Sequence, residues 1–279
     1  MVSSTRPVPS ARATEVRRPA PFLSVVVPAY NEERRIGESM RRIGAYLASQ
    51  PYASEVVAVD DGSEPASQDA LNAAVTALPR TVRGRVLRLD TNQGKGAAVR
   101  EGCLAAEGRY VAFLDADLAT PAEELPRLLD ALDRGADIAI GVRNQEDGSD
   151  MRERRGFGRR LAGAAFSLAM NRLLPEVKDS QCPLKAFRMD SCRQLFARQQ
   201  VRTWAFDAEL LFIARKLGLT VHQVPVQWQD IEDSKLRLNL RTLSEPLNLA
   251  RIWWIHRRLG RAGSGEPTPA LWSSSRPFS

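Results

Sequence analysis

Residues 113–121 read FLDADLATP, and they mark the predicted end of a buried strand. Residues 110–114 are apolar and have the length typical of such a strand. Two aspartates, Asp115 and Asp117, follow it at once. Because side chains at positions i and i+2 of an extended segment lie on the same face, the two carboxylates are expected to point to one place beyond the strand.

A pair of carboxylates at a strand end suits a hard divalent cation. Mg²⁺ and Mn²⁺ prefer oxygen ligands, and Mg²⁺ usually takes some of them from water and from substrate phosphates. We therefore predict that Asp115 and Asp117 hold Mg²⁺ or Mn²⁺. The structural alternative is that Asp115 ends the strand and Asp117 caps a helix begun by Pro121 and Glu123, and the rest of the sequence decides between them.

Strands and helices are predicted to alternate along the chain. Apolar runs predict strands at residues 22–27, 56–59, 85–89, 110–114, 137–142 and 220–226. Helical patterns follow at residues 31–47, 67–78, 96–106, 121–134, 157–174, 190–198 and 206–217. This alternation predicts an α/β fold with a Rossmann-like, mixed but mainly parallel sheet flanked by helices.

Polar residues follow four of the predicted strands. In parallel sheets of this kind, ligands bind in the crevice beyond the carboxyl ends of the strands. The polar segments found there are Tyr30-Asn31-Glu32, Asp60-Asp61, the run NQGKG at 92–96, and Asp115 with Asp117. Their repetition at successive strand ends favours a binding site over a set of unrelated turns.

The composition favours an anionic partner. The chain has 279 residues, a net charge of +7 and 43% hydrophobic residues, which is enough for one large domain or two small ones. Nucleic acid, acidic lipid and phosphorylated substrates all fit this charge. The three cysteines have no metal-type spacing, and their odd number predicts reduced thiols in a cytoplasmic protein.

The two ends of the chain differ from its middle. We expect a disordered basic tail at residues 1–20, a folded domain at 21–238, an amphipathic helix region at 239–260 and a second disordered tail at 261–279. The sequence shows neither the apolar region of a signal peptide nor a run of 18 apolar residues. Any membrane contact is therefore expected to be peripheral. In the last helix, Trp253 and Trp254 lie among arginines, which suits contact with lipid headgroups or packing against the domain or a partner.

Two common phosphate-binding motifs are absent. Gly94-Lys95-Gly96 lacks the other residues of a Walker loop, and the first strand leads into PAYNEE in place of a dinucleotide fingerprint. The helix that starts at Gly96 could still approach an anion with its N-terminus, or Lys95 could be a surface charge.

Four segments, in this order and spacing, carry a family resemblance. VVVPAYNEE (25–33), VAVDDGS (57–63), NQGKGAAVREG (92–102) and FLDADLATP (113–121) resemble the nucleotide-sugar-binding half of family 2 glycosyltransferases with the GT-A fold. DSQCPLKAF (179–187), WAFDAELLFIARKLGL (204–219), VPVQW (224–228) and SKLR (234–237) are similar to dolichyl-phosphate β-glucosyltransferases and bacterial polyprenyl-phosphate enzymes. The resemblance covers residues 22–237.

The resemblance implies an inverting, metal-dependent glycosyltransferase. The implied reaction moves glucose from UDP-glucose to a dolichyl or polyprenyl phosphate at the cytoplasmic face of a membrane. Transfer of mannose from GDP-mannose, or to a soluble acceptor, is the alternative within enzymes. A basic module that binds nucleic acid or a membrane surface is the non-enzymatic alternative, and the acidic strand ends argue against nucleic acid as a partner.

The same resemblance implies roles for individual residues. Pro28, Tyr30, Glu32 and Asp60 would hold the base and ribose, while Asp61 would do the same or cap its turn. Lys95 would face the diphosphate or the sugar, and Asp115 and Asp117 would hold the divalent ion, with Asp117 the favoured direct ligand. Asp207 and Glu209 are the candidate catalytic residues, with positioning of the acceptor as an alternative to proton transfer. The candidates for phosphate recognition are Arg143, Arg154, Arg155, Lys185, Lys235 and Arg237.

Overall fold

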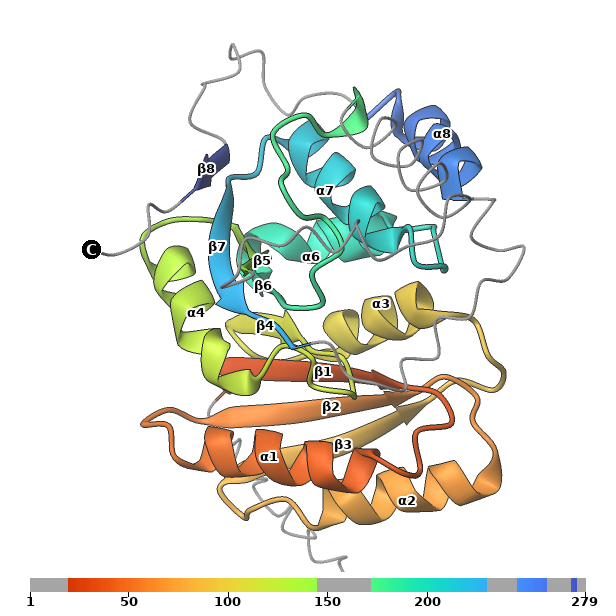
Figure 1. Ribbon diagram of the computed structural model, residues 1–279, viewed down its shortest axis with the longest axis vertical. Helices are drawn as coiled ribbons and strands as arrows, with labels where there is room; N and C mark the ends of the chain where they lie inside the picture. Colours follow the sequence, from red (N-terminus) through yellow and green to blue (C-terminus); the bar gives the residue numbers. More distant parts are fainter. Residues whose placement is uncertain (1–19, 145–171, 230–244, 260–271, 275–279) are drawn as a thin grey trace, which may run out of the picture.

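One sheet of eight strands organises the part of the chain that the computed structural model describes, which comprises residues 20–144, 172–229, 245–259 and 272–274 (Figure 1). The strand order is β3-β2-β1-β4-β6-β5-β7-β8. The strands are β1 (Leu23–Ala29), β2 (Ser54–Asp60), β3 (Val82–Arg88), β4 (Tyr110–Phe113), β5 (Ile138–Asn144), β6 (Lys185–Arg188), β7 (Val221–Gln227) and β8 (Trp272–Ser274).

The sheet is mixed but mainly parallel, as predicted. β1 pairs in parallel with β2 and β4, and β2 pairs in parallel with β3. β6 runs antiparallel to both β4 and β5, and β5 continues in parallel to β7 and β8. The short strand β8 lies within the tail for which we expected no order, and its pairing with β7 corrects that expectation for residues 272–274.

Helices cover both faces of the sheet (Figure 1). The helices are α1 (Ile36–Ala48), α2 (Pro65–Thr76), α3 (Lys95–Ala105), the short 3₁₀ turn η1 (Ala122–Glu124), α4 (Leu125–Asp133), α6 (Met189–Arg198), α7 (Phe206–Leu217) and α8 (Glu245–His256). Among the described residues, no helix is long and apolar enough to cross a membrane.

The alternation of side chains along the central strands divides the interior into two cores. In β1, Val25 and Val27 belong to the core shared with α1, α2 and α4, whereas Val26 belongs to the core shared with α3, α6 and α7. This is the two-residue period expected of strands buried on both faces. α8 packs outside α7, where Leu249 and Ile252 join the second core.

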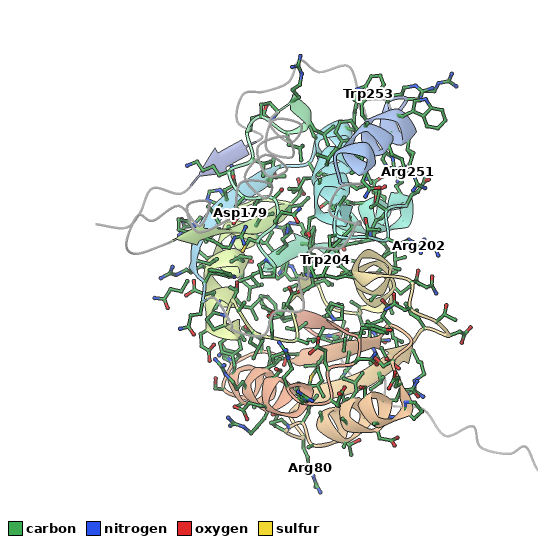
Figure 2. All side chains as sticks on the ribbon, turned by 45° about the vertical axis from the view of Figure 1, so that its right-hand side comes forward. Arg80, Asp179, Arg202, Trp204, Arg251 and Trp253 are labelled. Carbon is green, nitrogen blue, oxygen red and sulfur yellow. The ribbon has the colours of Figure 1, made fainter. Side chains whose placement is uncertain are left out.

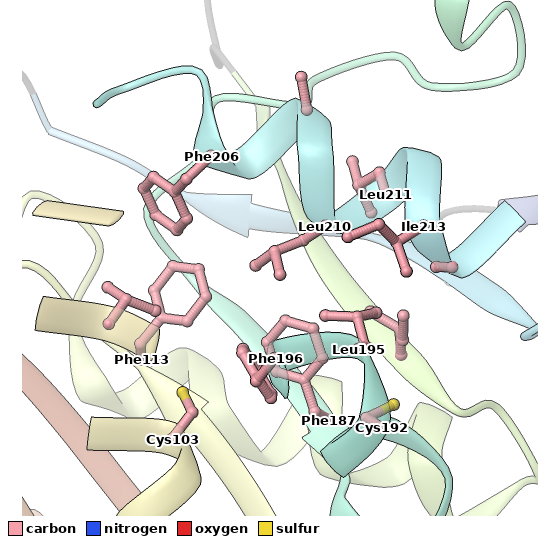
Figure 3. Close-up of a cluster of buried hydrophobic side chains, with 14 of the residues drawn as sticks. Cys103, Phe113, Phe187, Cys192, Leu195, Phe196, Phe206, Leu210, Leu211 and Ile213 are labelled. Atoms are coloured by element: carbon pink, nitrogen blue, oxygen red, sulfur yellow. The ribbon is translucent and has the colours of Figure 1, made fainter. Parts of the chain in front are cut away.

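An aromatic cluster joins the end of β4 to the start of α7 (Figure 3). Phe113 lies 5.8 Å from Phe206 and 5.9 Å from Phe187, measured between ring centroids. Phe187 in turn meets the Phe196 ring at 5.0 Å in an edge-to-face arrangement. Because Phe113 is the last residue of β4, this packing fixes the position of the acidic residues that follow it.

The first helix begins later than the sequence predicted. Asn31 has a left-handed backbone conformation with φ of 52°, and α1 starts only at Ile36. The Asn31 amide donates to the Ser63 hydroxyl at 3.0 Å, and its side-chain oxygen accepts from the Glu64 amide at 2.9 Å. These bonds tie the loop after β1 to the loop after β2, which explains why Asn31 does not continue as helix. Most of the helix predicted at 157–174 lies outside the described residues.

Candidate active site

The carboxyl ends of β1, β2 and β4 meet at one edge of the sheet because these adjacent strands are parallel. Pro28 is the second-to-last residue of β1 and lies opposite Val59 of β2. Tyr30 follows the strand and is 44% exposed. Glu32, predicted to bind the nucleotide, forms an ion pair of 2.9 Å with Arg35.

Asp60 and Asp61 play different structural parts at the end of β2. Asp60 is fully buried; one oxygen accepts from the Ser63 amide at 3.0 Å, and the other lies 3.1 Å from Arg88 Nε. Asp61 accepts two backbone N–H bonds from residues 93 and 94, at 2.7 and 2.9 Å. Burial raises the pKa of Asp61, and these two bonds partly oppose that rise. Both oxygens of Asp61 are therefore engaged by the loop that follows β3.

Asp115 and Asp117 lie on a tight turn beyond β4. The expectation of an extended pair was wrong, because β4 ends at Phe113 and the Leu118 amide donates back to the Asp115 carbonyl at 3.1 Å. Both aspartates remain partly exposed. The Ser39 hydroxyl of α1 holds the turn through the carbonyl of residue 116 at 2.5 Å.

Each carboxylate of this acidic turn has an identifiable environment. Burial raises the pKa of Asp117, while a bond from the amide of residue 119 partly opposes the rise. Asp115 Oδ1 lies 2.5 Å from Lys95 Nζ. Burial is the largest influence on the pKa of Lys95 and lowers it, but the carboxylates of Asp115 and Asp207 raise that pKa above its usual value overall. Lys95 therefore keeps its positive charge next to the turn.

Two glycines set the position of Lys95 at the first residue of α3. Gly94 has φ of 100°, a conformation that favours glycine. The Gly96 amide donates to the Arg202 carbonyl at 2.9 Å, and a Cβ on Gly96 would lie 2.7 Å from Phe206 Cβ. The start of α3 is thus pressed against the segment that leads into α7. Trp204 of that segment lies beside Lys95, with 4.7 Å between Nζ and the ring centroid.

Lys185 and Asp207 form a buried ion pair. Lys185 Nζ lies 2.5 Å from Asp207 Oδ1 and donates to the Cys182 carbonyl at 2.7 Å. Lys185 is inaccessible to solvent and Asp207 is 3% exposed. Burial raises the pKa of Asp207, and the charge of Lys185 partly opposes this. Lys185 was predicted to bind phosphate, but its ammonium is already engaged inside the protein.

Glu209 is also engaged on all sides. Its two oxygens accept from the amides of Gln200 and Val201, and Oε1 lies 2.7 Å from His256 Nε2 of α8. A carboxylate offers about four lone-pair sites, so these contacts fill its capacity. The side chain is 0% exposed. This geometry is that of a structural link between α7, α8 and the loop before α7, and it gives no support to a catalytic role.

Arg143 is the one phosphate-recognition candidate that the described chain leaves partly exposed. It pairs with Asp179 at 2.7 and 3.0 Å and lies 5.5 Å from the centroid of the Trp228 ring. Burial acts to raise the pKa of Asp179, but Arg143 lowers it below its usual value. The remaining candidates, Arg154, Arg155, Lys235 and Arg237, lie outside the described residues.

The acidic turn provides a donor set that fits Mg²⁺ or Mn²⁺. No group of three or more His, Cys, Asp or Glu side chains gathers for a metal within the described ranges. Mg²⁺, however, is usually bound by one or two carboxylates, with waters and substrate phosphates completing its shell. Asp115 and Asp117 supply two carboxylates on one turn, and the ammonium of Lys95 against Asp115 shows that a positive charge is accommodated there.

Comparison with known proteins gives consistent results. Residues 24–196 match the family model described as Glycosyl transferase family 2. Dolichyl-phosphate beta-glucosyltransferase of Drosophila melanogaster is 36% identical over 246 residues, which cover 84% of this chain and 75% of that protein. The enzymes of the same name from Dictyostelium discoideum and Homo sapiens are each 32% identical, and the matches cover 77% and 78% of this chain and 68% and 70% of those proteins.

A solved structure shares the fold. Glucosyl-3-phosphoglycerate synthase from Mycobacterium tuberculosis, in complex with Mn²⁺, uridine diphosphate and glucosyl-3-phosphoglycerate, superposes with a TM-score of 0.60 at 21% identity. The match covers 88% of this chain and 82% of that one. A crystal of the same synthase with Mg²⁺ and uridine diphosphate gives a TM-score of 0.59 at 20% identity, with the same coverage. The predicted fold class is thereby confirmed.

Proposed function

Because the chain belongs to glycosyl transferase family 2, we propose that it transfers glucose from UDP-glucose to a dolichyl or polyprenyl phosphate with inversion at the anomeric carbon. The observation that carries this proposal is the similarity to dolichyl-phosphate beta-glucosyltransferases, which are up to 36% identical over most of the chain. The matched family region includes the acidic turn and Lys95. The sugar and the acceptor follow from these relatives, and the chemistry follows from the site.

The acidic turn and Lys95 are proposed to receive the diphosphate. Asp115 and Asp117 would hold Mg²⁺ or Mn²⁺, which when bound would offset the negative charge that develops on the leaving nucleoside diphosphate. Lys95 would move its ammonium from Asp115 toward a phosphate oxygen, and it stays charged in this environment. Lys95 is the first residue of α3, so the positive end of the helix dipole would add to the attraction for a phosphate there.

The nucleoside is proposed to lie over the ends of β1 and β2. The exposed ring of Tyr30, two residues after Pro28, offers a flat surface to the base. Asp60 is covered by the Arg88 side chain, which is itself 44% exposed. A contact between the nucleoside and Asp60 therefore requires Arg88 to swing away, and Glu32 would have to leave its pair with Arg35 in the same way.

A phosphate acceptor changes what is required of the carboxylates near α7. A phosphate monoester with a second pKa near 6 is largely ionised at neutral pH, so the nucleophile needs no general base. Asp207 is buried in an ion pair with Lys185. The oxygens of Glu209 are all occupied by hydrogen bonds to backbone amides and by the contact with His256. We therefore propose positioning roles for both residues in place of proton transfer. Arg143 is the described residue proposed to meet the acceptor phosphate.

The proposed acceptor is a membrane lipid, so the protein is proposed to work as a peripheral protein at the cytoplasmic membrane surface. The three cysteines are buried and unpaired, which suits a reducing compartment. Mannosyl transfer from GDP-mannose is the alternative, and the experiment below distinguishes it from glucosyl transfer.

The test is an incorporation assay. The full chain is incubated with Mg²⁺, polyprenyl phosphate and either labelled UDP-glucose or labelled GDP-mannose, and label is counted in the organic phase. We expect incorporation from UDP-glucose, and its loss in Asp117→Asn. Incorporation only from GDP-mannose would correct the donor. Full incorporation in Asp117→Asn or in the presence of a chelator would overturn the metal assignment.

A further inference from the structure

A pocket of about 340 Å³ lies between the C-terminal half of α7 and α8, away from the acidic turn. Its lining combines three cations with apolar groups. The cations are Arg172, Arg215 and Lys216, and the apolar side chains include Phe212, Trp253 and Leu259. Among the residues described around it, none of those that line the pocket is acidic.

The cations of this pocket are only partly neutralised. Arg215 donates to the carbonyl of residue 173 at 3.1 Å, and its nearest carboxylate, that of Glu176, is 3.9 Å away and 42% exposed. Lys216 Nζ lies 5.6 Å from the centroid of the Phe212 ring. A solvent-exposed ion pair of this length contributes little, so the pocket keeps an excess of positive charge.

Trp253 lines the pocket, and Trp254 is the next residue of α8. Trp253 and Trp254 of α8 are 55% and 62% exposed, and they are two of the four large hydrophobic side chains found exposed on the described residues. Arg257 lies over the Trp254 ring, 4.5 Å from its centroid. Figure 2 shows Trp253 extending outward from α8, at the end of the molecule opposite Arg80. Exposed tryptophans beside arginines are the pattern of a helix that lies at headgroup level.

α8 is held firmly enough to present these side chains. Ile252 is fully buried in the core against α7, and His256 lies 2.7 Å from the buried Glu209. The pocket and the candidate active site therefore share α7, with Asp207 near its start and Lys216 near its end. Nine residues of helix separate these two, which is about 14 Å along the axis.

We propose that this pocket, together with Trp253 and Trp254, docks the protein on an anionic phospholipid bilayer. A lipid phosphate would sit among Arg172, Arg215 and Lys216, and the tryptophan rings would enter the headgroup layer. The proposal rests on the proposed function, because a lipid-linked acceptor requires the site to work at a membrane surface. Charge complementarity selects the anionic bilayer as the occupant.

The test is co-sedimentation of the full chain with phosphatidylcholine vesicles, with or without phosphatidylglycerol. We expect sedimentation with the anionic vesicles and its loss as salt is added. The double variant Arg215→Gln/Lys216→Gln should bind about thirtyfold more weakly, since each basic residue near an anionic surface contributes about 1 kcal/mol. Trp253→Ala/Trp254→Ala should bind more weakly as well. Arg41→Gln/Arg80→Gln serves as the matched control and should leave binding nearly unchanged. Arg41 belongs to α1, which lies at the end of the molecule opposite α8 (Figure 1), and Arg80 lies at that same end (Figure 2).

Two further measurements keep the outcome clear. Circular dichroism of each variant checks the fold, and turnover of a short-chain, water-soluble prenyl phosphate checks the transferase separately. Full turnover with loss of vesicle binding in the pocket variants supports the docking surface. Equal vesicle binding by wild type and pocket variants overturns it, as does equal loss in the control variant. Tighter binding of a labelled oligonucleotide, lost in the same pocket variants, would assign the patch to nucleic acid instead. Absence of turnover in every protein, with vesicle binding intact, contradicts only the proposed reaction.

Discussion

Replacing Lys185 by methionine should destabilise the protein strongly. The substitution keeps most of the side-chain volume but leaves Asp207, which is 3% exposed, as a buried carboxylate without its cation. Removing one partner of a buried ion pair costs about 3–5 kcal/mol in the free energy of unfolding. For a domain of this size, that corresponds to a fall in the melting temperature of about 6–20 °C.

The assay is chemical and thermal unfolding of Lys185→Met beside two controls. The double variant Lys185→Met/Asp207→Leu removes both charges and should recover most of the lost stability, because a buried pair is often replaced by apolar residues at little cost. Arg41→Gln breaks the exposed pair with Glu38 and should leave stability nearly unchanged, because solvent screens a pair of this kind.

The effect of Lys185→Met should also depend on pH. Burial already raises the pKa of Asp207, and loss of the lysine removes a charge that opposes this rise. A carboxyl group whose pKa is higher in the folded state favours folding while it is protonated, and that contribution is lost as the pH rises through the folded-state pKa. The cost of Lys185→Met should therefore shrink as the solution is made more acidic. A variant as stable as the Arg41→Gln control, with a raised KM for the acceptor, would refute the buried pair and restore the phosphate-binding role first predicted for Lys185.

Three further changes test other parts of the site. Asp117→Asn should abolish glucosyl transfer while the melting temperature stays within a few degrees of wild type; retained transfer counts against the metal site. Gly96→Ala should cost about 1–3 kcal/mol of unfolding free energy, because its Cβ would meet Phe206 Cβ at 2.7 Å, and calorimetry that finds no change would contradict the close packing of α3. His256→Ala should leave Glu209 without one partner and cost about 1–3 kcal/mol, with faster hydrogen exchange in α8 as the local readout; unchanged exchange would show that the contact does not hold α8.

Much of the fold followed from patterns close together in the sequence. The apolar runs located the central strands, and the alternation of strand and helix gave the mainly parallel sheet. Since parallel neighbouring strands have their carboxyl ends at the same edge, the polar residues after these strands had to lie together. Asp60, Lys95 and the acidic turn were therefore identified as one group. The late start of α1 was missed because the left-handed conformation of Asn31 depends on bonds to residues 32 and 33 positions further on.

The sequence by itself located the polar strand ends and predicted the edge of the sheet at which they meet, because a strand's period and its carboxyl end are local properties. Tertiary structure alone decided which charges remain available to a ligand. Lys185 and Asp207 are 22 residues apart, and Glu209 and His256 are 47 apart, yet each pair closes on itself in the interior. A buried charge must find a partner wherever packing brings one, and no local pattern specifies that partner.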